Sequence, residues 1–201
     1  KKYPNVKCIV MEKNEGYGYG NNYGIKLSTT RFVFILNPDA RLQDNTLDEL
    51  DKVSNEIKNF AILAPTLISN ELKEGFGLTK NYGLYKKNLN TTSEFFEVDY
   101  IQGCAFLLDK SELENIGFFD ENIFMYFEDI DFCSSIRKLG HRVLFASDVE
   151  IVHVRGLSAQ TAPEATARAY QKSHLAFYEK HLPLWVPVLR VYLRFRPSRP
   201  F

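Results

Sequence analysis

The chain has 201 residues, a length that fits one domain or one domain with an appendage. Hydrophobic residues make up 45% and charged residues 25%, values close to the globular average that exclude general disorder. The 25 basic and 25 acidic side chains cancel, which argues against a nucleic-acid-binding protein held by bulk charge. The balance is uneven, because the stretch from Arg168 to Phe201 carries seven basic residues and one acidic residue.

Cysteine usage and apolar run lengths exclude further classes. Cys8, Cys104 and Cys133 are an odd number at long spacings, which indicates buried free thiols in a reducing compartment rather than a disulfide framework or a zinc cluster. No apolar run approaches the roughly 20 residues that span a bilayer. The basic start is followed by no apolar stretch of signal-peptide length. We therefore expect a cytoplasmic protein.

The first part of the chain alternates short apolar runs with helical patterns. Strands are predicted at residues 7–11, 31–36 and 61–64, and helices at residues 21–28 and 46–60. A strand–helix–strand–helix–strand order predicts an α/β fold, with a mostly parallel sheet and helices on both faces.

The second part is more varied. Residues 66–100 are polar and predict loops with hairpin segments. Further elements are expected as follows: a return to the sheet at 101–108, a helical turn at 111–114, a helix at 127–139 ending at Gly140, strands at 142–145 and 150–154, and a long helix at 162–181. We expect residues 1–160 to form the main domain and residues 161–201 to form a C-terminal helix and a basic, aromatic tail.

The turn after the strand at residues 31–36 carries Asp39. Ligands of open parallel sheets bind beyond the carboxyl ends of the strands, where a carboxylate on a rigid turn can bind a divalent cation that in turn holds phosphate oxygens. The alternative is an ordinary Asn-Pro-Asp turn. His153, in the apolar strand at 150–154, is either a hydrogen-bonded core residue or an additional ligand of that cation.

A glycine-rich stretch occupies residues 16–24, between a predicted strand and a predicted helix. Backbone N–H groups in such a loop can face a phosphate or a sugar. The spacing fails the Gly-x-Gly-x-x-Gly pattern of dinucleotide-binding proteins, because the sixth position is Asn21 counted from Gly16 and Tyr23 counted from Gly18. A flexible loop packed with tyrosines is the alternative.

Acidic residues are densest between Glu112 and Asp131, where seven acids occur without a basic residue. Three of them open a predicted helix, whose dipole stabilises negative charge. Because Glu128, Asp129 and Asp131 repel one another and are flanked by aromatic residues, at least one should have a raised pKa. Such a group can remove a proton from a hydroxyl group. Two interpretations of these acids are therefore open: a catalytic base, or a helix start that is stabilised by the dipole.

Five motifs stand in one order along roughly residues 6–156. They are NEGYGYGNNYG at 14–24, LNPD at 36–39, QGCA at 102–105, GFFDE at 117–121 and FMYFEDIDF at 124–132, closed by Arg137, Gly140 and His153. Together they resemble glycosyltransferase family 2, and most closely the rhamnosyltransferase-like branch that builds bacterial cell-surface polysaccharide. The resemblance implies a GT-A (Rossmann-like) fold, a nucleotide-diphosphate-sugar donor, a divalent metal (Mg²⁺ or Mn²⁺) and inversion at the anomeric carbon.

The same resemblance implies roles for individual residues. Asp39 matches the metal-binding acid of the family's Asp-x-Asp motif, and His153 matches the later histidine that completes the metal site. Asp129 matches the catalytic base, with Glu128 beside it. The residues that it places along the donor are Gly16, Tyr17, Gly18, Asn21, Asn22, Asn37, Asp39 and Gly103.

The implied activity is inverting, metal-dependent transfer of a sugar, with rhamnose the first choice, to a hydroxyl group of a glycan or lipid-linked acceptor in cell-surface polysaccharide synthesis. Family members usually begin with a strand and a helix that hold the nucleotide base, ahead of the strand at 7–11. We therefore expect an N-terminally incomplete GT-A domain that binds nucleotide weakly or not at all. A non-catalytic carbohydrate-binding, nucleotide-sugar-binding or scaffold fragment is the alternative. A sugar-nucleotide-forming nucleotidyltransferase would need a basic glycine-rich loop near the start, which the sequence lacks.

The segment at residues 182–196 mixes aliphatic residues, tryptophan and tyrosine with arginines. This composition fits a bilayer surface with anionic headgroups, so we expect peripheral contact with the inner face of the membrane. The alternative is a C-terminal helix packed on the domain, with its arginines reaching toward solvent.

Overall fold

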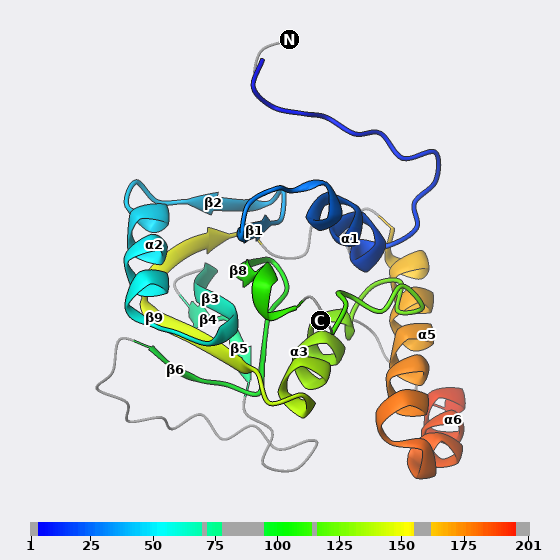
Figure 1. Cartoon of the computed structure of the whole chain (residues 1–201). Coiled ribbons are helices and arrows are strands. Elements are labelled where there is room, and N and C mark those ends of the chain that lie inside the picture. Colours follow the sequence, from blue (N-terminus) through cyan, green and yellow to red (C-terminus); the bar gives the residue numbers. More distant parts are fainter. Residues whose placement is uncertain (1–3, 70–71, 78–94, 114–115, 155–161, 196–201) are drawn as a thin grey trace.

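The centre of the molecule is a mixed β-sheet (Figure 1). The structure, a computed structural model, describes residues 4–69, 72–77, 95–113, 116–154 and 162–195. The main strand order is β1–β8–β3–β9–β2. These strands are β1 (Phe32–Leu36), β2 (Ala40–Leu42), β3 (Phe60–Ser69), β8 (Ala105–Asp109) and β9 (Arg142–His153). The others are β4 (Leu72–Glu74) on β3, β6 (Phe95–Glu97) on β9, and the separate pair β5 (Phe76–Gly77) and β7 (Tyr100–Ile101).

The strand directions correct one part of the prediction. β3 and β9 pair in parallel, and β1 runs in the same direction because β8 lies antiparallel between β1 and β3. β2, β4 and β6 also pair antiparallel. The α/β fold is confirmed, but a mostly parallel sheet is wrong for the described strands. Parallel pairing needs helical crossovers, and the described residues between β3 and β8 form short strands instead.

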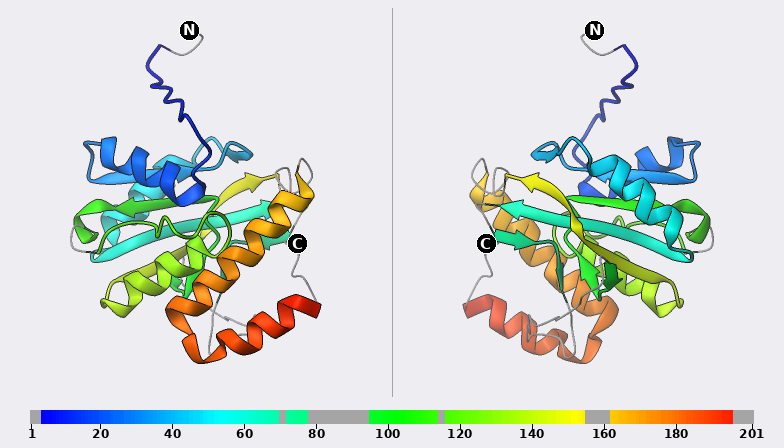
Figure 2. Two further views of the ribbon diagram at one scale, coloured as in Figure 1. Left: turned by 90° about the vertical axis from the view of Figure 1, so that its right-hand side faces the viewer. Right: turned by 90° about the vertical axis from the view of Figure 1, so that its left-hand side faces the viewer.

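Helices cover both faces of the sheet, as predicted (Figure 2). Leu107 of β8 belongs to the buried cluster that contains the apolar side of α2 (Thr46–Glu56). The preceding residue, Phe106, belongs to the cluster that contains side chains of α1 (Tyr17–Leu27) and α3 (Glu128–Lys138). Because successive side chains of a strand point to opposite faces, the sheet separates these two cores.

The C-terminal part is helical. α5 (Pro163–His181) confirms the predicted long helix, and a 3₁₀ turn (Pro183–Trp185) leads into α6 (Val186–Phe195), which packs on α5 (Figures 1 and 2). α3 ends before Gly140, whose φ of 86° fits the predicted C-terminal glycine. None of the helices within the described ranges combines the length and the apolar character needed to cross a bilayer.

The strand predicted at residues 7–11 is not formed. Residues 4–16 extend away from the sheet, and Val10 is 87% exposed (Figure 1). An apolar run is stable as a strand only where a neighbour satisfies its backbone, and this segment pairs with no strand of the described sheet. Cys8 is exposed, contrary to expectation, whereas the other two cysteines are buried free thiols as predicted.

The glycine-rich stretch is helical rather than a loop. α1 begins at Tyr17, four residues before the predicted start at Asn21, and Gly16 precedes it with a φ of 100°. A glycine inside a helix costs about 1 kcal/mol relative to alanine. Close packing offsets that cost here, because a Cβ on Gly18 would lie 2.9 Å from the Cβ of Phe119.

Other boundaries differ from the prediction: the helix expected at 46–60 ends at Glu56, and the strand expected at 61–64 runs from Phe60 to Ser69. The strands expected at 142–145 and 150–154 are one strand, β9, whose register against β3 shifts midway. Thr66 donates its hydroxyl hydrogen to the carbonyl oxygen of Ser147 at 2.8 Å, which satisfies a backbone group within the irregular part. The turn expected at 111–114 is a 3₁₀ helix at Lys110–Glu112.

Candidate active site

Three backbone segments meet beyond the carboxyl end of β1. The N–H group of Asn37 donates to the carbonyl oxygen of Cys104 at 2.8 Å. The N–H group of Gly103 donates to Oδ2 of Asp129 at 3.0 Å. These bonds join the turn that carries Asp39, the turn before β8 and the first turn of α3 into one continuous row. The structure therefore brings together residues that the sequence placed 90 positions apart.

Asp39 and His153 lie side by side at the ends of two strands. Oδ1 of Asp39 is 3.5 Å from Nε2 of His153, and both side chains are largely shielded from solvent. Backbone pairing fixes this arrangement, because Ala40 pairs with His153 and the N–H group of Val154 donates to the carbonyl oxygen of Asp39 at 3.0 Å. Adjacent ligands of an octahedral cation at about 2.1 Å lie about 3.0 Å apart. A small adjustment would let both side chains bind one cation.

The chemistry of this pair fits a cation that is shared with another ligand. A carboxylate oxygen and an imidazole nitrogen are compatible with Mn²⁺, and an open carboxylate site is compatible with Mg²⁺. Among the residues that the structure describes, no group of three or more His, Cys, Asp or Glu side chains surrounds one point. The two side chains would leave coordination positions for phosphate oxygens and water.

Asp129 is held by backbone groups. Besides the bond from Gly103, its Oδ1 accepts a hydrogen bond from the N–H group of Ile130 at 2.8 Å. Burial raises the pKa of Asp129, and the two N–H donors oppose that shift because they stabilise the charged form. Its orientation is therefore fixed by two hydrogen bonds that favour a carboxylate.

Glu128 has a different environment. Its side chain is 7% exposed, and its buried Oε2 has no hydrogen-bond partner among the described residues. Burial, together with repulsion from Asp129, raises the pKa of Glu128 to about 8. Since two adjacent carboxyl groups resist double ionisation, the unpartnered oxygen of Glu128 and the two N–H donors to Asp129 favour the proton on Glu128 and the charge on Asp129.

Tyr17 completes the row from the side of α1. Its hydroxyl group donates a hydrogen bond to the carbonyl oxygen of Gly103, and its N–H group donates to the carbonyl oxygen of Phe124 at 2.9 Å. Burial and the nearby acids Glu128 and Asp129 raise its pKa well above the ordinary value, so the hydroxyl stays protonated and remains a donor. Tyr17 therefore fixes the carbonyl of the glycine whose N–H group holds Asp129.

Glycine is required next to this row. A Cβ on Gly16 would lie 2.3 Å from the carbonyl oxygen of Phe124, closer than any side chain allows. A Cβ on Gly103 would lie 3.3 Å from the Cβ of Asp129 and 3.5 Å from the hydroxyl oxygen of Tyr17. The close approach therefore requires glycine at Gly16, whereas a side chain at Gly103 would be tightly packed against Asp129.

Two other residues that were predicted along the donor, Asn21 and Asn22, make hydrogen bonds within the protein. Asn22 is buried, and its amide donates to the carbonyl oxygen of Phe119 and to Glu121, both at 2.9 Å, while its oxygen accepts from the N–H group of Phe119. Asn21 donates to the carbonyl oxygen of Tyr17 within α1. These contacts hold α1 against the loop before α3, and we give Asn22 that structural role.

A strained turn precedes the acids, and no pattern in the sequence indicated it. Tyr126 and Phe127 have φ values of 68° and 67°, although neither is glycine. Each residue in this conformation costs on the order of 1–3 kcal/mol, and it persists where surrounding structure holds it. Rings of α5 surround the turn, with Tyr170 and His174 5.2 and 4.6 Å from the Phe127 ring.

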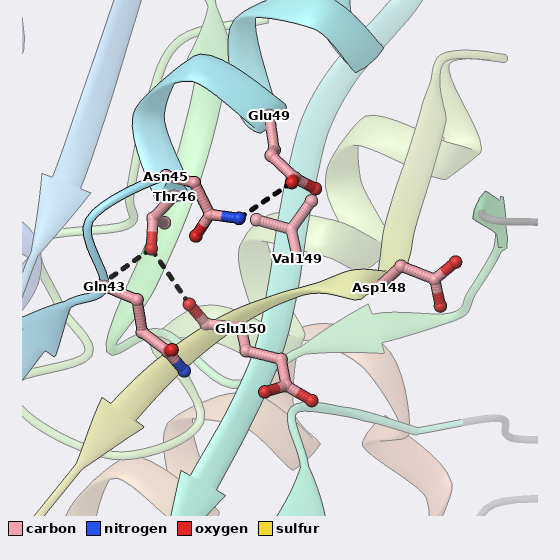
Figure 3. Close-up of a pocket in the computed structure, with 7 residues that line it drawn as sticks. All are labelled: Gln43, Asn45, Thr46, Glu49, Asp148, Val149 and Glu150. Carbon is pink, nitrogen blue, oxygen red and sulfur yellow. Dashed lines mark hydrogen bonds between the residues drawn. The ribbon is translucent and has the colours of Figure 1, made fainter.

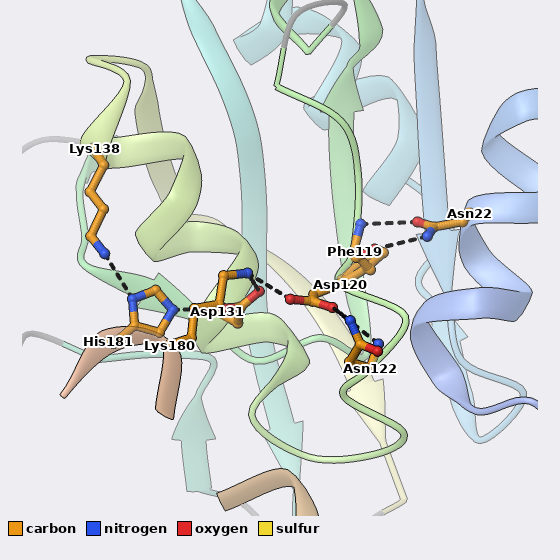
Figure 4. Close-up of polar contacts among 8 residues, drawn as sticks. All are labelled: Asn22, Phe119, Asp120, Asn122, Asp131, Lys138, Lys180 and His181. Carbon is orange, nitrogen blue, oxygen red and sulfur yellow. Dashed lines mark hydrogen bonds and ion pairs between the residues drawn. The ribbon is translucent and has the colours of Figure 1, made fainter. Parts of the chain in front are cut away.

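Asp131 lies in the same first turn of α3 as Glu128 and Asp129, but its contacts hold elements of the fold together (Figure 4). Its Oδ1 is 2.6 Å from Nε2 of His181, and its Oδ2 accepts from Nζ of Lys180 at 2.9 Å. Lys138 approaches Nδ1 of the same histidine at 2.8 Å, which fits the tautomer with the proton on Nε2. Lys180 also donates to Asp120 at 2.9 Å. These contacts join α5 to α3, and sequence reasoning missed them because the partners are about 50 residues apart.

A pocket of about 90 Å³ lies between the start of α2 and β9 (Figure 3). Thr46 crosses it, accepting from the N–H group of Gln43 at 2.9 Å and donating to the carbonyl oxygen of Glu150 at 3.0 Å. Its lining is polar and acidic, and it includes none of the predicted site residues. The contacts across this pocket connect α2 to β9, and the pocket is separate from the candidate active site.

Comparison with known proteins agrees with this geometry. The family model described as "Glycosyl transferase family 2" matches residues 1–145. The hexosyltransferase Agl10 of low-salt glycan biosynthesis in Haloferax volcanii is 28% identical over 180 residues, which cover 84% of this chain and 58% of that protein. The N-acetylglucosaminyl-diphospho-decaprenol L-rhamnosyltransferase of Mycobacterium tuberculosis is 25% identical, with 96% of this chain and 74% of that protein covered. The chain thus spans little more than half the length of the first of these relatives.

Solved structures show the same fold. GalNAc-T7 with UDP, GalNAc and Mn²⁺ superposes with a TM-score of 0.59 at 14% identity, covering 82% of this chain and 35% of that one. The mannosyltransferase PcManGT of Pyrobaculum calidifontis, with GDP-Man and Mn²⁺, gives 0.55 at 16% identity, covering 89% and 49%. The predicted GT-A fold is therefore confirmed. Since the family model covers more than half of the sequence, the chain belongs to glycosyl transferase family 2, in a branch whose relatives include rhamnosyltransferases and hexosyltransferases.

Proposed function

We propose that the chain catalyses inverting, metal-dependent transfer of a sugar from a nucleotide-diphosphate donor to a hydroxyl group. The observation that carries this proposal is the row of contacts that links the Asp39–His153 pair through Cys104 and Gly103 to Asp129. A cation-binding pair stands at one end of the row and an ionised carboxylate at the other. Departure of a diphosphate and deprotonation of a hydroxyl group need these two functions close together.

Asp39 and His153 would hold the divalent cation, Mg²⁺ or Mn²⁺. When bound, the cation offsets the negative charge that develops on the departing diphosphate. Both solved neighbours contain Mn²⁺ together with a nucleotide or nucleotide sugar, which supports the same class of cofactor here. The missing side chain at Gly103 keeps space open beside Asp129 for the reacting groups.

Asp129 is the proposed base. The acceptor hydroxyl attacks the anomeric carbon from the face opposite the diphosphate, the bond to the diphosphate oxygen breaks, and Asp129 takes the hydroxyl proton. Because this single displacement forms no covalent intermediate on the protein, it inverts the configuration. Glu128 keeps its own proton, so the site carries one negative charge beside the reacting hydroxyl.

The names of the relatives support a substrate class. One relative is named a dTDP-rhamnosyl transferase and another transfers rhamnose to a lipid-linked sugar, so we propose a deoxyhexose or hexose donor and a glycan or lipid-linked acceptor. Cell-surface polysaccharide synthesis is the corresponding process. We expect rhamnose from a dTDP donor as the first substrate to test.

The test is a transfer assay with dTDP-rhamnose, UDP-GlcNAc and GDP-mannose, using a GlcNAc-diphosphate-polyprenol analogue as acceptor, in the presence of Mn²⁺, Mg²⁺ or EDTA. One donor should release nucleoside diphosphate only with metal, and the product anomer should be inverted by NMR. Asp39→Asn should abolish metal-dependent release, and the exposed Asp44→Asn serves as its matched control. Full activity in EDTA, or a retained anomeric configuration, would contradict the proposed mechanism.

We further propose that the α6 region contacts the membrane on the side where nucleotide sugars are available. Val186 and Leu189 are buried against the rest of the protein, whereas Trp185 and Phe195 are 59% and 78% exposed. Arg194, at the end of α6, is exposed as well. Exposed aromatic and aliphatic side chains beside arginines suit an anionic bilayer surface, where lipid-linked acceptors lie.

Vesicle flotation tests the membrane contact. The protein should float with phosphatidylcholine vesicles that contain phosphatidylglycerol and less with vesicles of phosphatidylcholine alone. The double variant Trp185→Ser/Phe195→Ser should lose flotation, whereas Leu139→Ser removes an equally exposed side chain after α3 and should not. Flotation that is absent in the wild type, or equal in both variants, would refute the contact.

A further inference from the structure

We propose that α5 is a positioning element for the proposed base, Asp129, and that His174 acts on Asp129 through Phe127. The proposal rests on the proposed function, since it takes Asp129 as the base. It concerns the strained turn that precedes α3, whose residues Tyr126 and Phe127 are not among the predicted site residues. His174 is a positioning residue here, because its described contacts are with aromatic rings and not with the acids.

The strained turn sets the direction of the acids. Tyr126 and Phe127 both adopt a left-handed backbone conformation, with φ values of 68° and 67°. Phe127 is also the residue whose carbonyl oxygen accepts the first hydrogen bond of α3, from the N–H group of Asp131 at 2.8 Å. Relaxation of either residue would therefore rotate the first turn of α3, and Asp129 with it. Residues other than glycine leave this conformation unless neighbouring groups hold them.

The neighbouring groups come from one face of α5. The Phe127 ring stacks on His174 with a centroid distance of 4.6 Å and an angle of 15° between the planes. Phe177 lies 5.5 Å from the same ring. Tyr170 contacts both strained residues, at 5.4 Å from the ring of Tyr126 and 5.2 Å from that of Phe127. Residues 170, 174 and 177 share one helix face, so α5 presents them together.

The His174 ring is available for stacking because it is neutral and partly buried. Burial lowers its pKa, and its Nδ1 has no hydrogen-bond partner among the described residues. A charged imidazole at this place would lose hydration without a compensating partner. Packing against Phe127 and Tyr178, whose ring lies 4.9 Å away, therefore sets the orientation of the ring.

Residues of α5 bind the acidic segment on both sides of Glu128 and Asp129. On the N-terminal side, Ser173 accepts a hydrogen bond from the N–H group of Met125 at 3.4 Å. On the C-terminal side, Asp131 is bound by Lys180 and His181. The two acids thus lie between two anchored points, and the hydrogen bond between Asp129 and Gly103 depends on both. The C-terminal helix is then part of the active-site framework rather than an appendage.

Hydrogen–deuterium exchange and kinetics on three variants test the proposal. His174→Ala removes the stacked ring, His174→Phe keeps a ring of similar shape, and Lys172→Ala changes an exposed residue of the same helix. His174→Ala should raise exchange at residues 125–131 by about 10-fold or more, since a segment released from its tertiary contacts exchanges by local opening. The other two variants should match the wild type.

Kinetics separate positioning from general support. His174→Ala should lower kcat by about 10- to 100-fold, because a displaced base costs rate, and should leave the donor KM within about twofold. His174→Phe should restore kcat. Unchanged exchange at residues 125–131 and unchanged kcat in His174→Ala would overturn the proposal, and so would a rise in KM alone. If His174→Ala does not fold, Tyr170→Leu carries the same comparison.

The two proposals fail in different ways. A wild-type protein that transfers no sugar would refute the proposed function, while exchange at residues 125–131 in His174→Ala would still decide whether α5 holds the turn. Conversely, an active wild type whose His174→Ala variant keeps its kcat and its exchange pattern would leave the transferase function intact and overturn the role of α5.

Discussion

Glu128 and Asp131 stand three positions apart on the first turn of α3, and both are buried, yet their surroundings are opposite. Asp131 is 1% exposed and is bound by Lys180 and His181. Glu128 is 7% exposed, faces Asp129 and has an oxygen without a partner among the described residues. Two carboxyl groups from one acidic run therefore have a paired and an unpaired environment.

The difference shows that acid density does not identify a functional group. A buried carboxylate that is paired with cations and hydrogen-bonded holds two elements together. A buried carboxyl group beside a second acid cannot ionise at its ordinary pKa, and it leaves the neighbouring carboxylate as the charge of the site. On this criterion the acidic run divides into a structural part, Asp120 and Asp131, and a chemical part, Glu128 and Asp129.

The largest effect is expected at Asp129, in the part of the acidic run that we assign to the chemistry. Asp129→Asn keeps the shape of the side chain and one oxygen that can accept from a backbone N–H group, but it removes the base, so the transfer rate should fall by about 10²- to 10⁴-fold. The fold and the binding of Mn²⁺ should be largely intact, since the Asp39–His153 pair is unchanged. Transfer assays with Mn²⁺ titration calorimetry measure both. A variant that retains full activity would remove Asp129 from its proposed role as the base.

In the structural part of the acidic run, Asp131→Asn should lower the free energy of unfolding. The change leaves Lys180 and His181 facing an amide, and weakening a buried hydrogen bond to a charged group costs about 1.5–3 kcal/mol. Urea unfolding followed by circular dichroism measures the free energy of unfolding. The transfer rate per folded molecule should fall far less than in Asp129→Asn. A stable but inactive Asp131→Asn protein would contradict the division of the acidic run.

Glu128→Gln should change how stability depends on pH. The folded-state pKa of Glu128 is about 8, above the ordinary 4.5, so the folded protein keeps a proton that the unfolded chain releases. The stability from this proton is fully present below the unfolded pKa and is lost as pH rises through the folded pKa. Glutamine does not titrate, so the variant should lose less stability than the wild type between about pH 5 and about pH 9. Parallel pH profiles for the two proteins would show that Glu128 ionises normally.

Local patterns predicted much of the fold and part of the site. The strand that β1 forms, the turn at Asp39 and the helix that begins at Glu128 all follow from apolar runs bounded by turn residues and acids. The closeness of Asp39 and His153 was expected only as one reading of His153, and it follows from strands that end at the same edge. These features depend on short stretches of sequence or on sheet geometry.

Long-range packing accounts for what the sequence did not predict. Glycines at 18, 20 and 24 disfavour a helix locally, but contacts of α1 with the loop at Phe119 override that preference. The charge balance along the sequence is uneven, with an excess of basic residues after Arg168 and an acidic run at residues 112–131. In the structure Lys180 and His181 of the C-terminal part bind Asp131 of that acidic run. No local pattern encodes such a pairing.

The smallest effect is expected for Lys180→Met, which tests how much of the stabilisation around Asp131 comes from Lys180 and how much from His181. The Lys180 side chain is 39% exposed, whereas the side chains of His181 and Asp131 are both 2% exposed. Solvent therefore screens the lysine bonds to Asp131 and Asp120, and their loss should cost about 0.5–1 kcal/mol, less in concentrated salt. Urea unfolding at low and high NaCl measures this difference. A cost that equals that of Asp131→Asn would mean that Lys180, rather than the buried histidine, is the principal partner of Asp131, and that the contrast with Glu128 depends on a surface ion pair.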